Sequence, residues 1–182
     1  RLGITESRLQ GLQDTVIKWS SWPEPRLLRF EKETSGIEAG TVIFENGEIV
    51  YGYPKIRRPL MLAPAIARHF PDMVAVEEKM NGHNVRVASI NGDTVALTRG
   101  GFVCPYSTEV ARRLVPEDLF ASQPHLVLCG EMVGPENPYV AKEVYPTDSI
   151  DFYLFDIAEK NAKGTFGVYR THEMAERFGL KA

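Results

Sequence analysis

The chain has 182 residues, of which 43% are hydrophobic and 25% charged, an ordinary globular composition that can bury a sizeable core. The formal net charge of −3 is evidence against a protein that binds nucleic acid over its whole surface, although a local basic track stays open. No apolar run approaches the roughly 18 to 20 residues that a membrane span needs, and Cys104 and Cys129 fit neither a zinc motif nor a dense disulfide framework.

Residues 1–58 are predicted to form an N-terminal module of mixed helix and β-hairpin. An apolar stripe predicts a helix at the start of residues 2–19, and the proline-containing stretch 20–25 breaks it. Residues 41–51 have strand-like halves on either side of Asn46-Gly47, which predicts a hairpin with a two-residue type I′ turn. No motif in this module indicates an activity.

Residues 59–182 are predicted to form a second unit. Because strands dominate its middle and helices flank them, the predicted fold class is α+β, with mainly antiparallel sheets. The predicted elements, in chain order, are helix 60–70, strand 74–78, hairpin 83–99, helix 107–114, strand 126–133, a loop rich in Pro and Asn over 135–146, strand 151–157 and helix 172–178.

The second hairpin has a predicted register. With Asn91-Gly92 as its two-residue loop, paired residue numbers sum to 183, which puts Asn84 opposite Arg99. Since side chains alternate along a strand, Asn84, Arg86 and Arg99 share one face, and Val85 points into the core. This face is either one wall of a phosphate-binding pocket or a solvated polar surface.

A lysine stands between the predicted strand 74–78 and a glycine-containing turn, in the run Glu78-Lys79-Met80-Asn81-Gly82. A lysine nucleophile must be held rigidly and must spend time as the neutral amine, whereas free lysine titrates near pH ~10.4. Gly82 would let the backbone turn sharply and approach a phosphate. The motif therefore indicates a lysine nucleophile, and the alternative is a surface lysine before a turn.

Three further pieces follow Lys79 in order. Arg99 ends the second hairpin before two glycines, Glu131 lies near the end of an apolar strand, and Phe152 belongs to an aromatic strand that begins with Asp151. Taken singly, each has a structural explanation: a surface charge, a helix cap or surface ion pair, and a core aromatic ring. Their order behind the lysine favours one composite site.

This series resembles the covalent nucleotidyltransferase superfamily of ATP-dependent ligases and mRNA capping enzymes. The sequence is most similar to archaeal homodimeric RNA ligases, because Asn84 stands five residues after Lys79 and because of the runs GEMVGPENPY and DFYLFDI. The resemblance covers about residues 74–157. It implies a ligase-type adenylyltransferase domain, ATP-grasp-like, over residues 59–182.

The resemblance implies a role for each matching position. Lys79 would attack the α-phosphorus of ATP and carry the AMP, and no metal ligand is implied among the matched residues. The implied nucleotide contacts are the Glu78 backbone at the adenine edge, Asn84 and Arg86 near phosphate, Arg99 at ribose or phosphate, Glu131 at the ribose hydroxyls and Phe152 stacked on adenine.

The implied function is RNA ligation. AMP would pass from Lys79 to an RNA 5′-phosphate, which is then joined to a 3′-hydroxyl, with ATP and Mg²⁺ or Mn²⁺ as cofactors. RNA ends and a second copy in a homodimer are the expected partners, with no membrane, in the cytoplasm. The family's further glutamate strand and Lys-x-Lys strand do not occur before Ala182. We therefore expect a domain that is incomplete at its C-terminus and a piece that is weak or inactive alone.

Two alternatives stay open. A DNA ligase or a GTP-using mRNA capping enzyme shares the chemistry, and base choice depends on backbone contacts that a sequence does not show. A non-catalytic module would keep the fold and hold RNA or a nucleotide without needing Lys79. Labelling with ATP and with GTP separates these possibilities.

Overall fold

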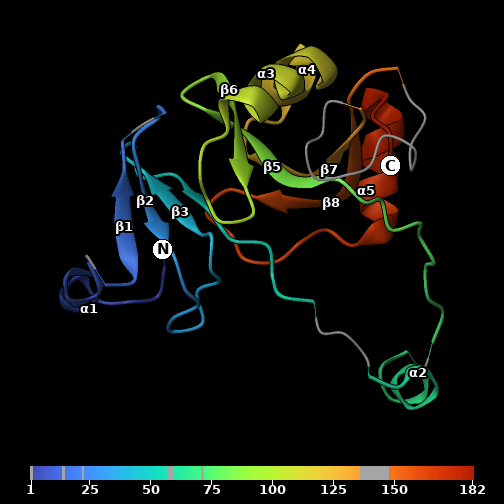
Figure 1. The fold of residues 1–182 in the computed structure, drawn as a ribbon, viewed down its shortest axis with the longest axis horizontal. Helices are drawn as coiled ribbons and strands as arrows, with labels where there is room; N and C mark the ends of the chain where they lie inside the picture. Colours follow the sequence, from blue (N-terminus) through green and yellow to red (C-terminus); the bar gives the residue numbers. More distant parts are fainter. Residues whose placement is uncertain (1, 14, 22, 57–59, 71, 136–147) are drawn as a thin grey trace.

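The computed structural model describes the chain except for residues 1, 14, 22, 57–59, 71 and 136–147. In the described part, two four-stranded antiparallel sheets are flanked by helices, which confirms the predicted α+β class (Figure 1). The first sheet has the order β1-β2-β3-β4, with strands Ile17–Ser20, Leu27–Phe30, Val42–Phe44 and Ile49–Val50. The second has the order β6-β5-β7-β8, with strands Asp93–Thr98, His83–Ile90, Leu126–Val133 and Asp151–Glu159.

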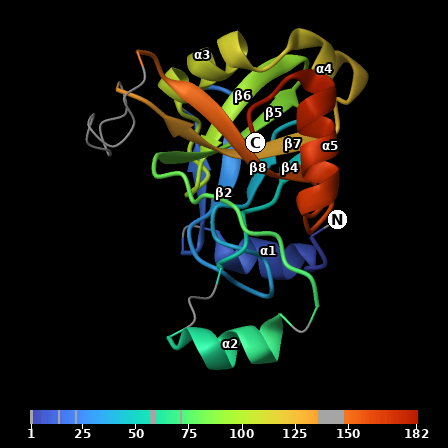
Figure 2. The same ribbon diagram turned by 90° about the vertical axis from the view of Figure 1, so that its right-hand side faces the viewer.

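Four of the five described helices pack on a sheet. Helix α1 supplies Leu9 and Leu12 to the apolar cluster on one face of the first sheet. Helices α3, α4 and α5 cover one face of the second sheet, and α2 stands clear of both sheets (Figures 1 and 2). The helices are α1 Glu6–Leu12, α2 Leu62–His69, α3 Pro105–Leu114, α4 Glu117–Ser122 and α5 Val168–Phe178.

Both faces of the second sheet are buried, by different partners. Val85 and Leu128 belong to the cluster under the helices. Ala88 and Cys129, on the opposite face, belong to a cluster shared with Val42 and other side chains of the first sheet. The two sheets therefore share one apolar core, and the predicted boundary between residues 58 and 59 lies outside the described residues.

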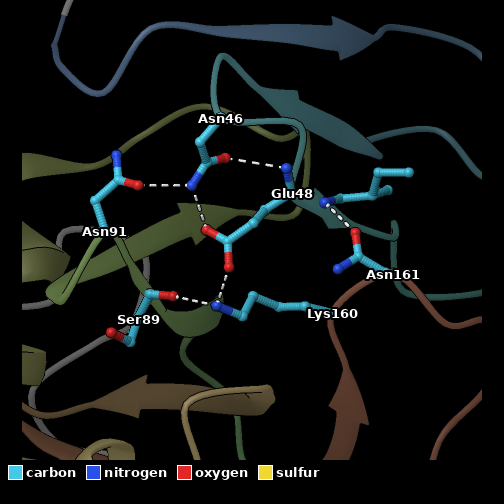
Figure 3. A network of polar contacts seen from close by, with 7 residues as sticks. Asn46, Glu48, Ser89, Asn91, Lys160 and Asn161 are labelled. Atoms are coloured by element: carbon cyan, nitrogen blue, oxygen red, sulfur yellow. Dashed lines mark hydrogen bonds and ion pairs between the residues drawn. The ribbon is translucent and has the colours of Figure 1, made fainter.

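A polar network also joins the tips of two hairpins (Figure 3). Asn46 donates from Nδ2 to Oδ1 of Asn91 over 2.7 Å, across the two sheets. Lys160 pairs with the carboxylate of Glu48 and donates to the carbonyl of Ser89 over 2.7 Å. The side chain of Lys160 is only 8% exposed, so this ion pair is held in place by its surroundings. The network holds the first sheet against one end of the second.

The first hairpin is present, but its predicted turn is wrong. Val42 pairs with Val50 and Ile43 with Ile49, and the amide of Phe44 donates to the carbonyl of Glu48 over 2.9 Å, which leaves the three-residue loop 45–47. Gly47 takes a left-handed φ of +84°, whereas Asn46 keeps a negative φ. A type I′ turn needs positive φ at both central residues, so the loop gains one residue and the register shifts.

The second hairpin confirms the predicted register. Asn91 and Gly92 both have positive φ, and Ile90 pairs with Asp93. The ladder ends at Val85 and Thr98, one pair short of the predicted Asn84–Arg99 pair. It ends there because the amide of Gly101 donates to the carbonyl of Thr98 over 2.9 Å, which closes a tight turn.

The predicted strand 74–78 is wrong, because residues 72–82 pair with no strand among the described residues. The predicted helix before it is confirmed as α2, although none of its residues is buried. Val76 is 92% exposed and Leu60 is 99% exposed. A strand needs a neighbour for its backbone hydrogen bonds, and this segment has none within the described chain.

Other predicted elements differ in detail. The helix at the start of residues 2–19 is confirmed by α1, but β1 and β2 were not predicted, since each has only four residues. Helix α4 was not predicted either. The predicted loop 135–146 lies almost wholly outside the described residues.

None of the described helices is long and apolar enough to cross a membrane.

Candidate active site

A row of three polar side chains crosses one end of the second sheet. Asn84 of β5 is the register partner of Glu131 on β7, and Glu131 is the partner of Tyr153 on β8. Directly paired residues lie on the same face of a sheet, so the three side chains form one surface. Asn84 Nδ2 donates to Glu131 Oε2 over a long 3.4 Å. The sequence prediction named Asn84 and Glu131, and the structure brings them together.

Glu131 also holds the turn that follows Lys79. Its Oε1 accepts a hydrogen bond from the amide of Gly82 over 3.3 Å. A Cβ atom at Gly82 would lie 2.3 Å from the carbonyl oxygen of Met132, so only glycine lets the backbone approach this closely. Gly82 thus allows a close approach to strand β7, whereas the predicted approach to a phosphate stays a prediction. A carboxylate offers about four acceptor sites, so Glu131 keeps capacity for a ligand.

Lys79 lies between two anchored points of an otherwise exposed segment. Glu77 Oε1 contacts His172 Nε2 of α5 at 3.0 Å on one side, and Gly82 meets Glu131 on the other. Lys79 is three residues from Gly82, which limits the separation of their Cα atoms to roughly 10 Å. Lys79 and Glu78 are both exposed. The structure thus places the lysine near the row, with its side chain accessible.

Arg86 is not part of an open phosphate pocket, contrary to the prediction. It is 1% exposed, and its guanidinium donates to the carbonyls of Tyr51 at 2.6 Å, Gly40 at 2.9 Å and Thr98 at 3.0 Å. Burial, opposed by Cys129 and reinforced by the charge of Arg99, lowers the pKa of Arg86 to about 10. The predicted face was correct, but the first sheet covers that face at Arg86.

Arg99 remains open to a ligand. It stands in the turn between Thr98 and Gly101, beyond the last pair of the β5–β6 ladder, and it is exposed. The residue before it, Thr98, pairs with Val85, the neighbour of Asn84, so the backbone of Arg99 lies near one end of the row. An exposed guanidinium presents paired donors suited to phosphate oxygens.

Phe152 is a core residue, which corrects its predicted role as an adenine platform. The ring is 2% exposed and belongs to the cluster under the helices. A Cβ at Gly130 would lie 2.2 Å from a ring carbon of Phe152, so the ring lies against the backbone of β7. Its register partner is Met132, the neighbour of Glu131, and adjacent residues of a strand point to opposite faces. Phe152 therefore faces away from the row.

The aromatic rings on the row's face are those of Tyr153 and Phe155, and the sequence prediction assigned neither of them to the nucleotide. Phe155 packs at the edge of the cluster between the sheets, edge-on to Tyr53 with ring centroids 5.2 Å apart. Tyr53 donates its hydroxyl to Asp156 Oδ2 over 3.0 Å, and burial raises the pKa of Tyr53 above its ordinary value. Alternation along DFYLFDI separates two sets of side chains. Only the pairing with β7 shows which set accompanies Glu131.

A groove of about 750 Å³ lies at the other end of the second sheet. Residues of the β5–β6 turn, such as Asn91, line it together with Arg112 and Phe120 of the helices. The described residues contain no group of three His, Cys, Asp or Glu side chains that could hold a metal ion. The candidate site is therefore assigned by the chemistry of its side chains and not by the size of its cavity.

Comparisons with known proteins agree with each other. The sequence profile of the RNA ligase family matches residues 72–182. An uncharacterised protein of Methanocaldococcus jannaschii is 37% identical over 171 residues, which cover 91% of this chain and 43% of the relative. Two solved structures of an archaeal ATP-dependent RNA ligase, forms 1 and 2, are 42% identical, with TM-scores of 0.90 and 0.87. In both, the match covers 98% of this chain and 49% of the other.

A solved structure of a putative ATP-dependent DNA ligase from Aquifex aeolicus is 31% identical, with a TM-score of 0.83. That match covers 96% of this chain and 47% of the other. The chain thus spans about half the length of the relatives that it matches.

Proposed function

Since the chain belongs to the RNA ligase family, we propose that it carries the part of an ATP-dependent RNA ligase that binds ATP and accepts AMP on Lys79. One observation carries the proposal. The turn after Lys79 is fixed to Glu131 through the amide of Gly82, and Glu131 also binds the side-chain amide of Asn84. A nucleophile held near groups that bind ribose and phosphate is what nucleotidyl transfer requires.

The proposed reaction has three steps. The neutral amine of Lys79 attacks the α-phosphorus of ATP, so that an N–P bond forms, the amine loses a proton and pyrophosphate leaves. The AMP then passes to the 5′-phosphate oxygen of an RNA, which frees the lysine. An RNA 3′-hydroxyl attacks that activated phosphate, the phosphodiester forms and AMP leaves.

The other side chains of the site would bind and orient ATP. Glu131 would accept hydrogen bonds from the ribose hydroxyls at its remaining acceptor positions, and Asn84 beside it would donate toward the phosphate. Arg99 would contact the phosphates with paired donors. The backbone at Glu78 would read the edge of the adenine. A side-chain amide, a carboxylate and a guanidinium thus bind different parts of one nucleotide.

We propose that adenine packs on Phe155, which lies on the face of Glu131, and not on Phe152. Stacking of a base on an aromatic ring is worth about 1–3 kcal/mol. Phe155→Ala in the full-length protein is therefore expected to raise the KM for ATP about tenfold in a lysine-labelling assay. Phe152→Leu is the matched control, expected to lower the melting temperature and leave that KM near wild type. If Phe152→Leu raised the KM for ATP and Phe155→Ala did not, the adenine would have to pack on Phe152 instead.

The described residues do not fit a protein-held Mg²⁺ or Mn²⁺, because they contain no cluster of three suitable side chains. The expected metal requirement rests on the resemblance alone, and no step above is routed through an ion. The homodimer expected from the resemblance is likewise a proposal. Both cysteines are free, which supports the proposed cytoplasmic location.

The segment before Lys79 exposes apolar side chains that additional chain could cover in a protein as long as the relatives. Met73, Val74 and Val76 expose between 52% and 92% of their surface, in an extended stretch without a neighbouring strand. Contiguous exposed apolar surface marks an interaction site. We propose that in such a protein additional chain pairs with this stretch and completes the site around Lys79.

A labelling and joining assay tests the proposed function. The full-length protein is incubated with ATP or GTP labelled at the α-phosphate, and then with 5′-phosphorylated RNA or nicked DNA. We expect covalent label from ATP and joining of RNA. The likeness to a putative DNA ligase makes DNA joining the second candidate. Label from GTP alone would indicate a capping-type enzyme, and no label from either nucleotide would reject nucleotidyl transfer.

A further inference from the structure

We infer that the first sheet, whose sequence indicates no activity, is a positioning element that fixes two sides of the ATP site: the turn that carries Arg99 and the strand that carries Phe155. The inference rests on the proposed function. The first sheet would contribute to nucleotide binding indirectly: its side chains do not contact the nucleotide, but they fix the residues that do.

The first contact joins Gly40 to the Arg99 turn. Gly40 has a φ of +83°, and a Cβ atom there would lie 2.1 Å from the carbonyl oxygen of Arg99. On the other side of the contact, a Cβ at Gly101 would lie 2.7 Å from the carbonyl oxygen of Gly40 and 2.9 Å from Val42. Two backbones therefore touch without side chains between them, and the position of one sets the position of the other.

Two arginines reinforce this contact. Buried Arg86 donates from one nitrogen to the carbonyls of Gly40 and Thr98, so it joins the first sheet to the residue before Arg99. The guanidinium of Arg29 on β2 lies 3.9 Å from the ring centre of Phe102, which ends the same turn. Arg29 is itself held by Glu31 at 2.7 Å. Contacts from the first sheet and its loops thus reach Thr98, the carbonyl of Arg99 and Phe102, that is, the start, the middle and the end of the turn.

The second contact joins Tyr53 to the aromatic strand β8. The hydroxyl of Tyr53 donates to Asp156, and its ring packs edge-on against Phe155, the preceding residue. Tyr53 follows directly on Gly52, whose amide donates over 2.9 Å to the hydroxyl of Thr41, the residue before β3. A shift of the first sheet would therefore move the ring of Phe155 as well as the backbone of Arg99.

These contacts act through other residues, so their loss should change how ATP is held. Displacement of a binding group by about 1 Å can cost about a hundredfold in rate. Arg99 and Phe155 are proposed to contact the phosphates and the base, and both interactions exist before the chemical step. The KM for ATP is therefore expected to rise more than the labelling rate at saturating ATP falls.

Gly40→Ala tests the first contact, with Gly47→Ala as its matched control. Both glycines belong to the region of the first sheet and have nearly the same left-handed φ, +83° and +84°, but Gly47 has no atom within 4 Å of its Cβ position. The backbone strain is thus shared, and only Gly40→Ala presses on the carbonyl of Arg99. We expect Gly40→Ala to raise the KM for ATP at least tenfold, and Gly47→Ala to stay within about twofold of wild type.

Tyr53→Phe tests the second contact and keeps the inference testable if Gly40→Ala does not fold. It removes one hydroxyl and keeps the ring, and Tyr169→Phe, on a 76% exposed residue, is the control. We expect Tyr53→Phe to raise the KM for ATP about fivefold, the net effect of one typical hydrogen bond. Tyr169→Phe should match wild type.

The readouts are the KM for ATP, the labelling rate at saturation and the melting temperature of each full-length variant. A lower melting temperature with an unchanged KM in Gly40→Ala and Tyr53→Phe would overturn the inference, because it would show a purely structural role. Equal KM values for Gly40→Ala and Gly47→Ala would do the same. A wild-type protein that takes no label from ATP would reject the proposed function instead.

Discussion

Full-length protein with Lys79→Ala is expected to take no covalent label from ATP and to join no RNA. The variant removes the only atom that the proposal allows to form the N–P bond, and loss of a nucleophile typically costs at least about a thousandfold in rate. Lys79→Arg should fail equally, because a guanidinium stays protonated and cannot attack phosphorus. Lys32→Ala, at another exposed lysine, is the control and should label as wild type.

Mass spectrometry of the labelled protein checks the assignment directly. The added AMP should be found on the peptide that contains Lys79 and should be released by acid, as expected for an N–P bond. AMP on a different lysine, or normal labelling of Lys79→Ala, would reject the site. If Lys79→Ala still joins RNA that already carries a 5′-AMP, the later steps use the remaining residues, which agrees with a lysine that acts only in transferring AMP.

Arg86→Met is expected to destabilise the protein strongly. The change removes the charged donor that binds the carbonyls of Tyr51, Gly40 and Thr98, and the carbonyl of Thr98 keeps a second backbone donor in the amide of Gly101. A hydrogen bond from a charged group contributes about 1.5–3 kcal/mol, so the loss of three of them should lower the free energy of unfolding by about 3–5 kcal/mol. The methionine fills much of the volume, so the loss reflects the hydrogen bonds.

Chemical denaturation of Arg86→Met and Arg99→Ala provides the comparison. Arg99 is exposed, so its truncation should change the free energy of unfolding by no more than about 0.5 kcal/mol while it raises the KM for ATP. For a protein of this size, the melting temperature of Arg86→Met should drop by about 10 °C. A loss below about 1 kcal/mol for Arg86→Met would mean that the carbonyls find water or other donors, and that Arg86 does not brace the two sheets.

The sequence by itself determined the features that depend on neighbours along the chain. Asn91-Gly92 forms a type I′ turn because both residues tolerate positive φ, and that turn alone sets the register from Ile90 to Val85. Lys79 and Gly82 are only three residues apart in the chain, so the sequence by itself also keeps them close together. The fold class followed from the same local patterns.

The tertiary structure decided which face of each strand meets the site. Alternation divides DFYLFDI into two sets of side chains, but both faces of the second sheet are buried, so hydrophobicity does not distinguish them. The pairing of β8 with β7 puts Tyr153 beside Glu131 and Phe152 beside Met132, and packing against Tyr53 puts Phe155 on the face toward the first sheet.

Arg86 shows the same limit for a charged residue. Its position in the hairpin was predicted correctly, but a guanidinium on a strand faces either a ligand or another part of the protein. Here the first sheet and its loops, which lie earlier in the chain, supply two of the three carbonyls that Arg86 binds.

The stretch before Lys79 was predicted as a strand, but a strand also needs a partner. The β propensity of a segment can be read from its sequence, whereas the neighbouring strand that it pairs with is known only from the fold.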